Sequence, residues 1–192
     1  MSHVQQASIE PARSALLVMD FQSAIVARYT SDDSPLLAAT AGAIRTARHH
    51  GMRIIYVVVS FRPGLPEISP RNRIFSAIRQ SGGIAPDIHP RVAPREDDVV
   101  VTKHRVGAFM GTDLEMILRA GGIDTLILAG ISTSGVVLST LRHAADADYR
   151  LFVLRDCCAD GDPEVHACLL DKVFPRQADV LESSALVTAL AI

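Results

Sequence analysis

The chain has 192 residues, enough for one α/β domain with a well-buried core, and 48% of them are hydrophobic, which excludes a disordered chain. Its formal charge of −2 excludes a basic nucleic-acid-binding surface, and no apolar run reaches the roughly 18 residues of a membrane span. The three cysteines do not suggest a disulfide framework and the first residues lack a secretory-signal layout, so we expect a cytoplasmic protein with reduced thiols.

Apolar runs and helical spacings alternate along the chain. Strands are predicted at residues 14–22, 52–61, 98–103, 123–130, 150–160 and at the start of 178–190. Helices are predicted at residues 35–50, 72–80, 111–122, 136–147, 162–174 and at the end of 178–190. This alternation predicts a Rossmann-like, three-layer α/β/α fold with a six-stranded parallel sheet, in one domain over residues 1–192.

Helix-capping residues support several of these boundaries. Asp33 or Ser34 is predicted to cap the first long helix. Thr112 and Glu115 have the spacing of a capping box, and Asp162 precedes a proline at the first position of its helix.

Residues 62–98 are rich in proline and glycine and have no predicted strand before their end. A stretch of this length is usually a lid or a binding loop, so we expect it to carry substrate specificity. A passive surface excursion would have the same composition.

The sequence LILAGISTSGVVLST, residues 126–140, has the pattern of a buried strand, a tight glycine turn and a helix. The first turn of such a helix has backbone N–H groups without internal partners, and they favour an anionic group or a polarised carbonyl. An ordinary strand-to-helix turn capped by serine and threonine is the alternative.

Asp20 and Lys103 lie at the carboxyl ends of two predicted strands, where ligands collect in open α/β sheets. If the first, third and fourth strands lie together near the centre of the sheet, both side chains meet the 130–136 turn. A buried carboxylate and a buried ammonium would hold each other charged and form a proton-handling pair. A structural ion pair, or two independent surface groups, is the alternative.

Three segments of the sequence resemble a known family. LLVMDFQ (16–22), VVTKHRVGAFMGTDLEMILRAGGIDTLILAGIST (100–133) and DCCADGDPEVHACLLDKVF (156–174) together resemble the isochorismatase-like hydrolases of the cysteine hydrolase superfamily. The resemblance implies that Asp20 and Lys103 are two members of a catalytic triad. It places the third member, normally a cysteine, at Val136, which cannot attack a carbonyl.

The missing thiol leaves the nucleophile open. A hydroxyl of a nearby residue is one substitute, and the candidates are Ser132, Thr133, Ser134 and Ser139. The family also contains members without the cysteine, including isochorismatases, in which the aspartate acts as general acid and water is the nucleophile. This resemblance favours water here, although the turn of this chain does not match theirs.

The resemblance also implies roles for the turn. The amides of Gly135 and Val136 would be oxyanion donors, and the peptide between Ile131 and Ser132 would be cis. Possible pocket-lining residues are Phe61, His104, Phe109 and Thr133, although Phe61 and Phe109 also fit a core role and His104 also fits a solvent-facing one.

Metal and cofactor ligands are not indicated. Residues 57–70 contain no histidine or aspartate, unlike the metal-binding region of nicotinamidases, so we expect no metal and no cofactor. A homo-oligomer, dimer or tetramer, is implied by the resemblance alone. We expect no nucleic-acid or membrane partner.

We therefore expect a hydrolase that cleaves an amide, ester or vinyl ether bond of a small molecule by Asp/Lys acid–base chemistry. The alternative is a catalytically inactive small-molecule-binding member of the same fold. A third hypothesis uses Cys157 or Cys158 as nucleophile, although packing is the favoured role of both. Cys168 is predicted to be core, His166 to be packing or surface, and Asp156 to accept backbone hydrogen bonds or to act in catalysis.

Overall fold

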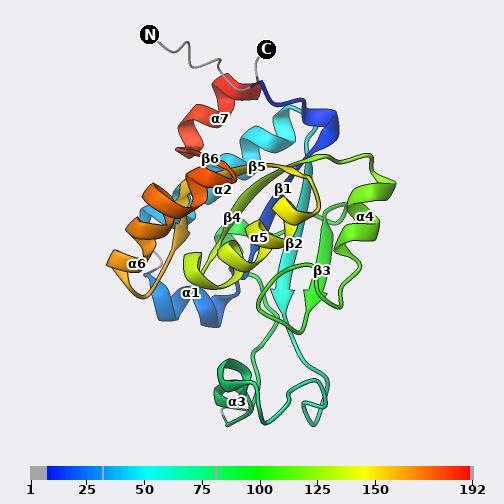
Figure 1. Ribbon diagram of the computed structural model, residues 1–192, viewed down its shortest axis with the longest axis vertical. Helices are drawn as coiled ribbons and strands as arrows, with labels where there is room; N and C mark the ends of the chain where they lie inside the picture. The colour runs from blue at the N-terminus through cyan, green and yellow to red at the C-terminus, as the bar shows by residue number, and fades with distance from the viewer. Residues whose placement is uncertain (1–7, 32, 81, 191–192) are drawn as a thin grey trace.

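The computed structural model describes residues 8–31, 33–80 and 82–190, so the first residues considered above for a secretory signal lie partly outside it. In this part of the chain six parallel strands form one sheet in the order β3-β2-β1-β4-β5-β6 (Figure 1). Their bounds are β1 Ser14–Met19, β2 Arg53–Val59, β3 Val99–Lys103, β4 Thr125–Ile131, β5 Arg150–Ala159 and β6 Asp179–Leu181.

Helices cover both faces of the sheet, which confirms the predicted α/β/α architecture. The α-helices are α1 Ser23–Tyr29, α2 Pro35–His49, α3 Arg73–Gln80, α4 Leu114–Ala120, α5 Leu138–Asp146, α6 Pro163–Cys168 and α7 Ser183–Leu190. Short 3₁₀ turns are η1 Pro11–Arg13, η2 Pro90–Val92 and η5 Phe174–Arg176, and π turns are η3 Thr133–Val137 and η4 Leu169–Val173. Within the described residues, no helix has the length and apolar character needed to cross a membrane.

The core has two halves, because successive residues of a strand point to opposite faces. Leu17 and Leu128 belong to the half that lies against α4, α5 and η4. Leu16 and Ile127 belong to the half that lies against α1, α2 and α7. The central strands are buried on both faces, as their continuous apolar runs predict.

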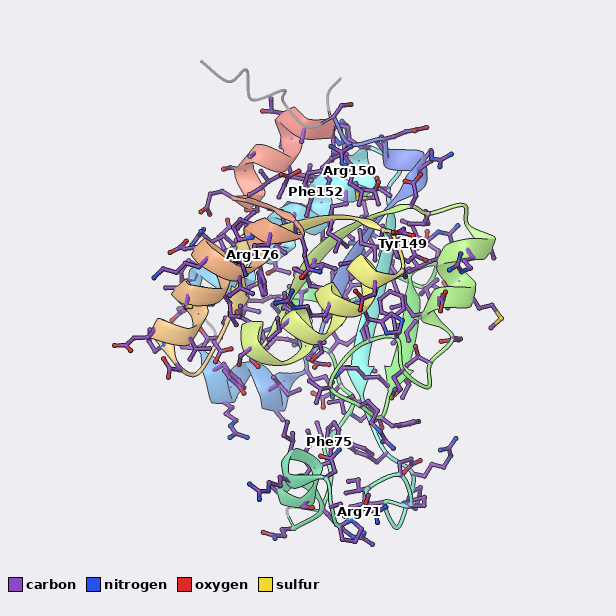
Figure 2. All side chains as sticks on the ribbon, in the orientation of Figure 1. Arg71, Phe75, Tyr149, Arg150, Phe152 and Arg176 are labelled. Atoms are coloured by element: carbon purple, nitrogen blue, oxygen red, sulfur yellow. The ribbon has the colours of Figure 1, made fainter. Side chains whose placement is uncertain are left out.

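The segment between β2 and β3 projects from the carboxyl edge of the sheet and carries α3 (Figure 1). Phe75 and Arg71 lie in this projecting part, well away from Tyr149 and Phe152 (Figure 2). Phe75 packs with Val59 and Ile68 in a small apolar cluster of its own. The predicted irregular stretch is therefore a distinct structural feature at the edge where the site was expected.

Two sequence predictions about this framework need correction, and one helix was missed. Strand β3 lies at the edge of the sheet and β2 separates it from β1, so the third strand does not lie beside the first and fourth, which pair with each other. Helix α1 was not predicted, because its seven residues bury little apolar surface. The capping box is also wrong: Thr112 Oγ1 accepts the Leu114 N–H, but Glu115 pairs with Arg119 instead.

Other caps are confirmed. The Ser34 side chain accepts the Leu36 N–H at the start of α2. The Asp162 carboxylate accepts two N–H groups in the first turn of α6, at 2.9 and 3.1 Å.

Gly130 in β4 is closely packed on the side where a side chain would project. A Cβ added there would stand 3.1 Å from Val137 Cγ2 and 3.2 Å from the Met19 carbonyl oxygen. The absence of a side chain at this position therefore lets the following turn approach β1.

We predict opposite effects for two glycine-to-alanine substitutions. Gly130→Ala should lower the free energy of unfolding by about 1–3 kcal/mol, because its Cβ overpacks a buried contact. Gly42→Ala, inside α2 with only the Arg45 guanidinium 3.8 Å away, should raise it by about 0.5–1 kcal/mol through higher helix propensity. Urea denaturation measures both, and a stabilised Gly130→Ala protein would contradict the close packing.

Candidate functional site

Asp20 follows the last residue of β1 and has a left-handed backbone conformation, with φ of 60°. Aspartate tolerates this conformation better than most residues. This conformation changes the direction of the neighbouring side chains. Met19 and Phe21 would share a face in a regular strand, but they lie in opposite halves of the core. The Asp20 N–H still donates to the Val57 carbonyl at 2.8 Å, so the backbone is anchored to β2 while it turns.

Lys103 is the last residue of β3 and reaches across the end of β2. Its Nζ lies 2.9 Å from Asp20 Oδ2, and both side chains are almost completely buried, with 3% and 8% of their surface exposed. The same Nζ donates to the carbonyls of Arg105 and Val106, at 3.1 and 3.0 Å. These contacts provide an acceptor for each of the three ammonium protons, which makes a charged lysine tolerable in this interior.

The Asp20 carboxylate is less completely satisfied. Its Oδ1 is buried and is the only such side-chain oxygen or nitrogen among the described residues that has no hydrogen-bond partner. Burial raises the pKa of Asp20 to about 6, against the opposing attraction of Lys103. The site therefore holds a buried carboxyl group with a raised pKa and one oxygen without a protein partner, which are features common at functional sites.

The turn after β4 begins beside this pair, since Met19 is in register with Gly130. The Ile131–Ser132 peptide is cis, as the resemblance implied. Residues Thr133–Val137 form a single π turn ahead of α5 instead of the predicted direct entry into the helix. The Val136 side chain is buried in the same half of the core as Met19.

One of the two predicted oxyanion donors, the Gly135 N–H, already has an acceptor within the turn. The Gly135 N–H donates to the Ser132 carbonyl within the turn, at 3.2 Å. Ser132 Oγ would lie only 2.6 Å from a Cβ on Gly135, so this serine covers the face of the glycine. Gly135 can serve an incoming ligand only by sharing or exchanging its present acceptor.

The predicted lining residues separate into two groups. Phe61 and His104 lie together at the base of the projecting segment, with ring centroids 6.0 Å apart, and His104 Nδ1 is 2.5 Å from the Ser60 carbonyl. Phe109 is buried and stacks on His143 at 4.4 Å. Thr133 is completely buried, so its hydroxyl faces protein groups.

The cysteines are poorly suited to nucleophilic attack. Cys157 and Cys158 are buried, and burial raises the pKa of both thiols, that of Cys158 to about 12. Reactive cysteines need the opposite shift. Cys168 is exposed, so its predicted core position is wrong: it lies on the outer side of α6.

Asp156 has a structural role, one of the two that the sequence left open. Its Oδ1 accepts the Ser183 N–H at 2.8 Å and its Oδ2 accepts the Ser183 hydroxyl at 2.6 Å, so it holds the start of α7. Both carboxylate oxygens of Asp156 therefore contact Ser183 at the start of α7.

Gln22 is a positioning residue that sequence reasoning missed. Its Oε1 accepts the Val59 N–H at 2.7 Å, and its Nε2 donates to the carbonyls of Val59 and Ala85 at 3.0 and 2.6 Å. The side chain thus joins the chain after β1 to the end of β2 and to Ala85 within the projecting segment. The available signal was a polar residue at the end of the apolar stretch 14–22, which is buried throughout.

No group of three or more histidine, cysteine, aspartate or glutamate side chains in the described residues is arranged to hold a metal ion. The expectation of a metal-free and cofactor-free site stays a prediction.

Comparisons with known proteins agree with this geometry. The sequence model of the isochorismatase domain matches residues 14–185. The uncharacterised isochorismatase family protein YwoC of Bacillus subtilis is 33% identical over 173 residues, which cover 88% of this chain and 89% of that protein. Maleamate amidohydrolase of Pseudomonas putida is 28% identical over 180 residues, 87% of this chain and 82% of that enzyme. The structure of an isochorismatase family protein from Burkholderia thailandensis superposes with a TM-score of 0.84 at 28% identity, over 97% of this chain and 99% of that one.

We predict that Lys103→Met destabilises the fold in a pH-dependent way. At pH 8 the substitution leaves an ionised Asp20 buried without its counter-charge, which should cost about 3–5 kcal/mol. Because the pKa of Asp20 is raised on folding, its protonated form is favoured in the folded state. The penalty should therefore shrink at pH 5 and grow as pH rises through the folded pKa.

Urea denaturation at both pH values measures this effect. Arg119→Met is the matched control, because it removes the cation of the exposed Glu115 pair and should cost no more than about 1 kcal/mol at either pH. An equal loss at pH 5 and pH 8 for Lys103→Met would contradict a charged, buried pair.

Proposed function

The chain belongs to the isochorismatase family of hydrolases, and we propose that it cleaves a small molecule by Asp20–Lys103 acid–base chemistry with water as the nucleophile. The bond we propose is an amide, an ester or a vinyl ether. One of the relatives, an amidohydrolase of maleamate, supports the amide.

One observation carries this proposal: the buried Asp20 Oδ1 has no partner although Lys103 holds the other oxygen. An unsatisfied buried carboxylate oxygen costs folding free energy, so a purely structural ion pair would be expected to satisfy it. A substrate or a bound water beside Oδ1 supplies the missing hydrogen bond and receives or gives the proton.

We propose water as the nucleophile because Val136, the two buried cysteines and Thr133 are engaged or unsuitable. Val136 has no nucleophilic atom, and the Cys157 and Cys158 thiols have raised pKa values. The Thr133 hydroxyl contacts the Ala159 carbonyl and His166. The raised pKa of Asp20 suits proton exchange with water near neutral pH.

The mechanism then depends on the bond. For an amide or ester, ionised Asp20 takes a proton from the attacking water and the turn amides at Gly135 and Val136 stabilise the oxyanion. Asp20 then gives that proton to the leaving amine or alcohol as the C–N or C–O bond breaks. For a vinyl ether, protonated Asp20 donates its proton to the vinyl carbon, water adds to the resulting oxocarbenium carbon and returns a proton to Asp20, and the adduct breaks its C–O bond to release the alcohol. Lys103 remains charged in both cases and controls the acidity of Asp20.

These two roles predict opposite pH profiles. Hydrolysis of an amide or ester should rise as pH increases through about 6, because Asp20 must be ionised, whereas cleavage of a vinyl ether should fall over the same range.

The substitution Asp20→Asn should lower kcat by about 100-fold or more, because it removes the group that exchanges the proton. Glu115→Gln, on the exposed face of α4, is the control and should leave the rate unchanged. The rate of hydrolysis by the purified protein is measured with panels of amides, esters and vinyl ethers. The assays run from about pH 4.5 to 8.5, a range of about four units around the pKa of Asp20. A full rate in Asp20→Asn would refute the proposed role.

A second prediction tests whether position 136 faces the site. A thiol introduced by Val136→Cys should react with iodoacetamide at pH 7.5 in the folded protein, because the resemblance places at this position a nucleophile that a substrate must reach. Exposed Cys168 provides an internal reference for complete reaction, while buried Cys157 and Cys158 should remain unlabelled. Peptide mass spectrometry reads all four positions. If Cys168 is labelled and position 136 is not, the side chain does not face an accessible cleft.

The alternative function, a small-molecule-binding protein without catalysis, is favoured by the buried apolar Val136 at the place where the resemblance puts the nucleophile. A thermal-shift screen separates the two functions. A stabilising ligand recovered chemically intact supports binding alone, and a ligand recovered as products supports hydrolysis.

A further inference from the structure

We propose that His166 and Asp160 are positioning residues that hold the 131–137 turn in place, with His166 neutral and protonated at Nδ1. The inference rests on the proposed function for its catalytic consequence, because the turn carries the amides of Gly135 and Val136. Its structural basis is independent of any substrate.

The Thr133 hydroxyl determines which nitrogen of His166 carries the proton. Thr133 Oγ1 lies 3.2 Å from the Ala159 carbonyl and 2.8 Å from His166 Nδ1, and Thr133 is completely buried. We assign the single hydroxyl proton to the carbonyl, which can only accept. In this arrangement Oγ1 accepts from His166, which makes Nδ1 the donor and gives a chain of hydrogen bonds from Nδ1–H through Oγ1–H to the carbonyl.

Asp160 holds the next residue of the turn. Its Oδ2 accepts the Ser134 N–H at 2.7 Å, and its Oδ1 accepts the Asp162 N–H at 3.3 Å. Asp162 is the cap of α6, the helix that carries His166. Two consecutive residues of the turn, Thr133 and Ser134, are therefore fixed by one short segment after β5.

The charges around His166 suit a neutral ring. Burial lowers the pKa of His166, Arg155 acts in the same direction, and Asp160 and Asp171 oppose both. Asp160 itself is ionised near neutral pH, since the N–H groups that it accepts bring its pKa below the ordinary value despite partial burial. A neutral imidazole next to an ionised carboxylate thus holds the turn without adding a positive charge there.

The tautomer can be tested on the unaltered protein. Side-chain ¹⁵N NMR of the full chain at pH 7.5 should show His166 as the neutral Nδ1–H form. The Nε2–H form or a fully protonated ring at this pH would overturn the proposal.

Two substitutions at one position test the anchoring. His166→Leu removes the donor, whereas His166→Asn keeps an N–H near the place of Nδ1. Loss of this hydrogen bond should speed amide exchange of Ser134, Gly135 and Val136 by about tenfold in the leucine variant, with exchange restored in the asparagine variant. The exposed His49, changed to leucine, is the control. Unchanged exchange in His166→Leu, or an equal increase in the amides of β1, would overturn a local positioning role.

Measurement of kcat for the His166 variants tests the catalytic consequence of the anchoring. With a substrate found in the panels above, His166→Leu should lower kcat by about 10- to 100-fold with little change in KM, and His166→Asn should recover most of it. An unchanged kcat in His166→Leu would overturn the catalytic part. If no substrate is turned over while the tautomer and exchange results hold, the proposed function fails and the anchoring stands.

Discussion

The site depends on a buried ion pair that neither partner could maintain alone. Taking a carboxylate and an ammonium out of water costs several kcal/mol for each ion, and their attraction offsets this only when the remaining hydrogen-bonding groups are satisfied. The chain satisfies the lysine with the carbonyls of Arg105 and Val106, which lie in the loop directly after its own strand. It leaves one oxygen of the aspartate unsatisfied. Among the buried side-chain oxygens and nitrogens of the described residues, this atom alone lacks a hydrogen-bond partner, and it lies at the carboxyl edge of the sheet.

Much of this architecture follows from local sequence physics. Continuous apolar runs identified the central strands, and the alternation with helices indicated a parallel sheet covered on both faces. Strand order was not accessible in this way, because it depends on contacts between residues far apart in the sequence. The pairing of Asp20 with Lys103 was predicted on the premise that β3 lies near the centre, but the structure brings them together although β3 is at the edge. The length of the lysine side chain and the left-handed turn at Asp20 account for this.

The remaining errors have related causes. Glu115 has the spacing of a capping box, but its neighbour Arg119 competes for the carboxylate. Cys168 fits an apolar helical pattern, but only tertiary packing decides which side of a short helix faces solvent. His166 and Asp160 contact the turn across a sequence separation of 33 and 26 residues, so no local pattern signals them. The side chains that hold the site were therefore harder to predict than the side chains proposed to react.

The Gln22 side chain imposes a chemical requirement on the end of β1. A primary amide presents a donor and an acceptor in one plane, and Gln22 uses both against the Val59 backbone and the donor again against Ala85. Glutamate has the same shape but only acceptors, so deamidation would turn two attractive contacts with carbonyl oxygens into repulsive ones. A single hydrolytic event, of the kind that accumulates as proteins age, would thereby loosen the projecting segment from the sheet without altering any catalytic atom.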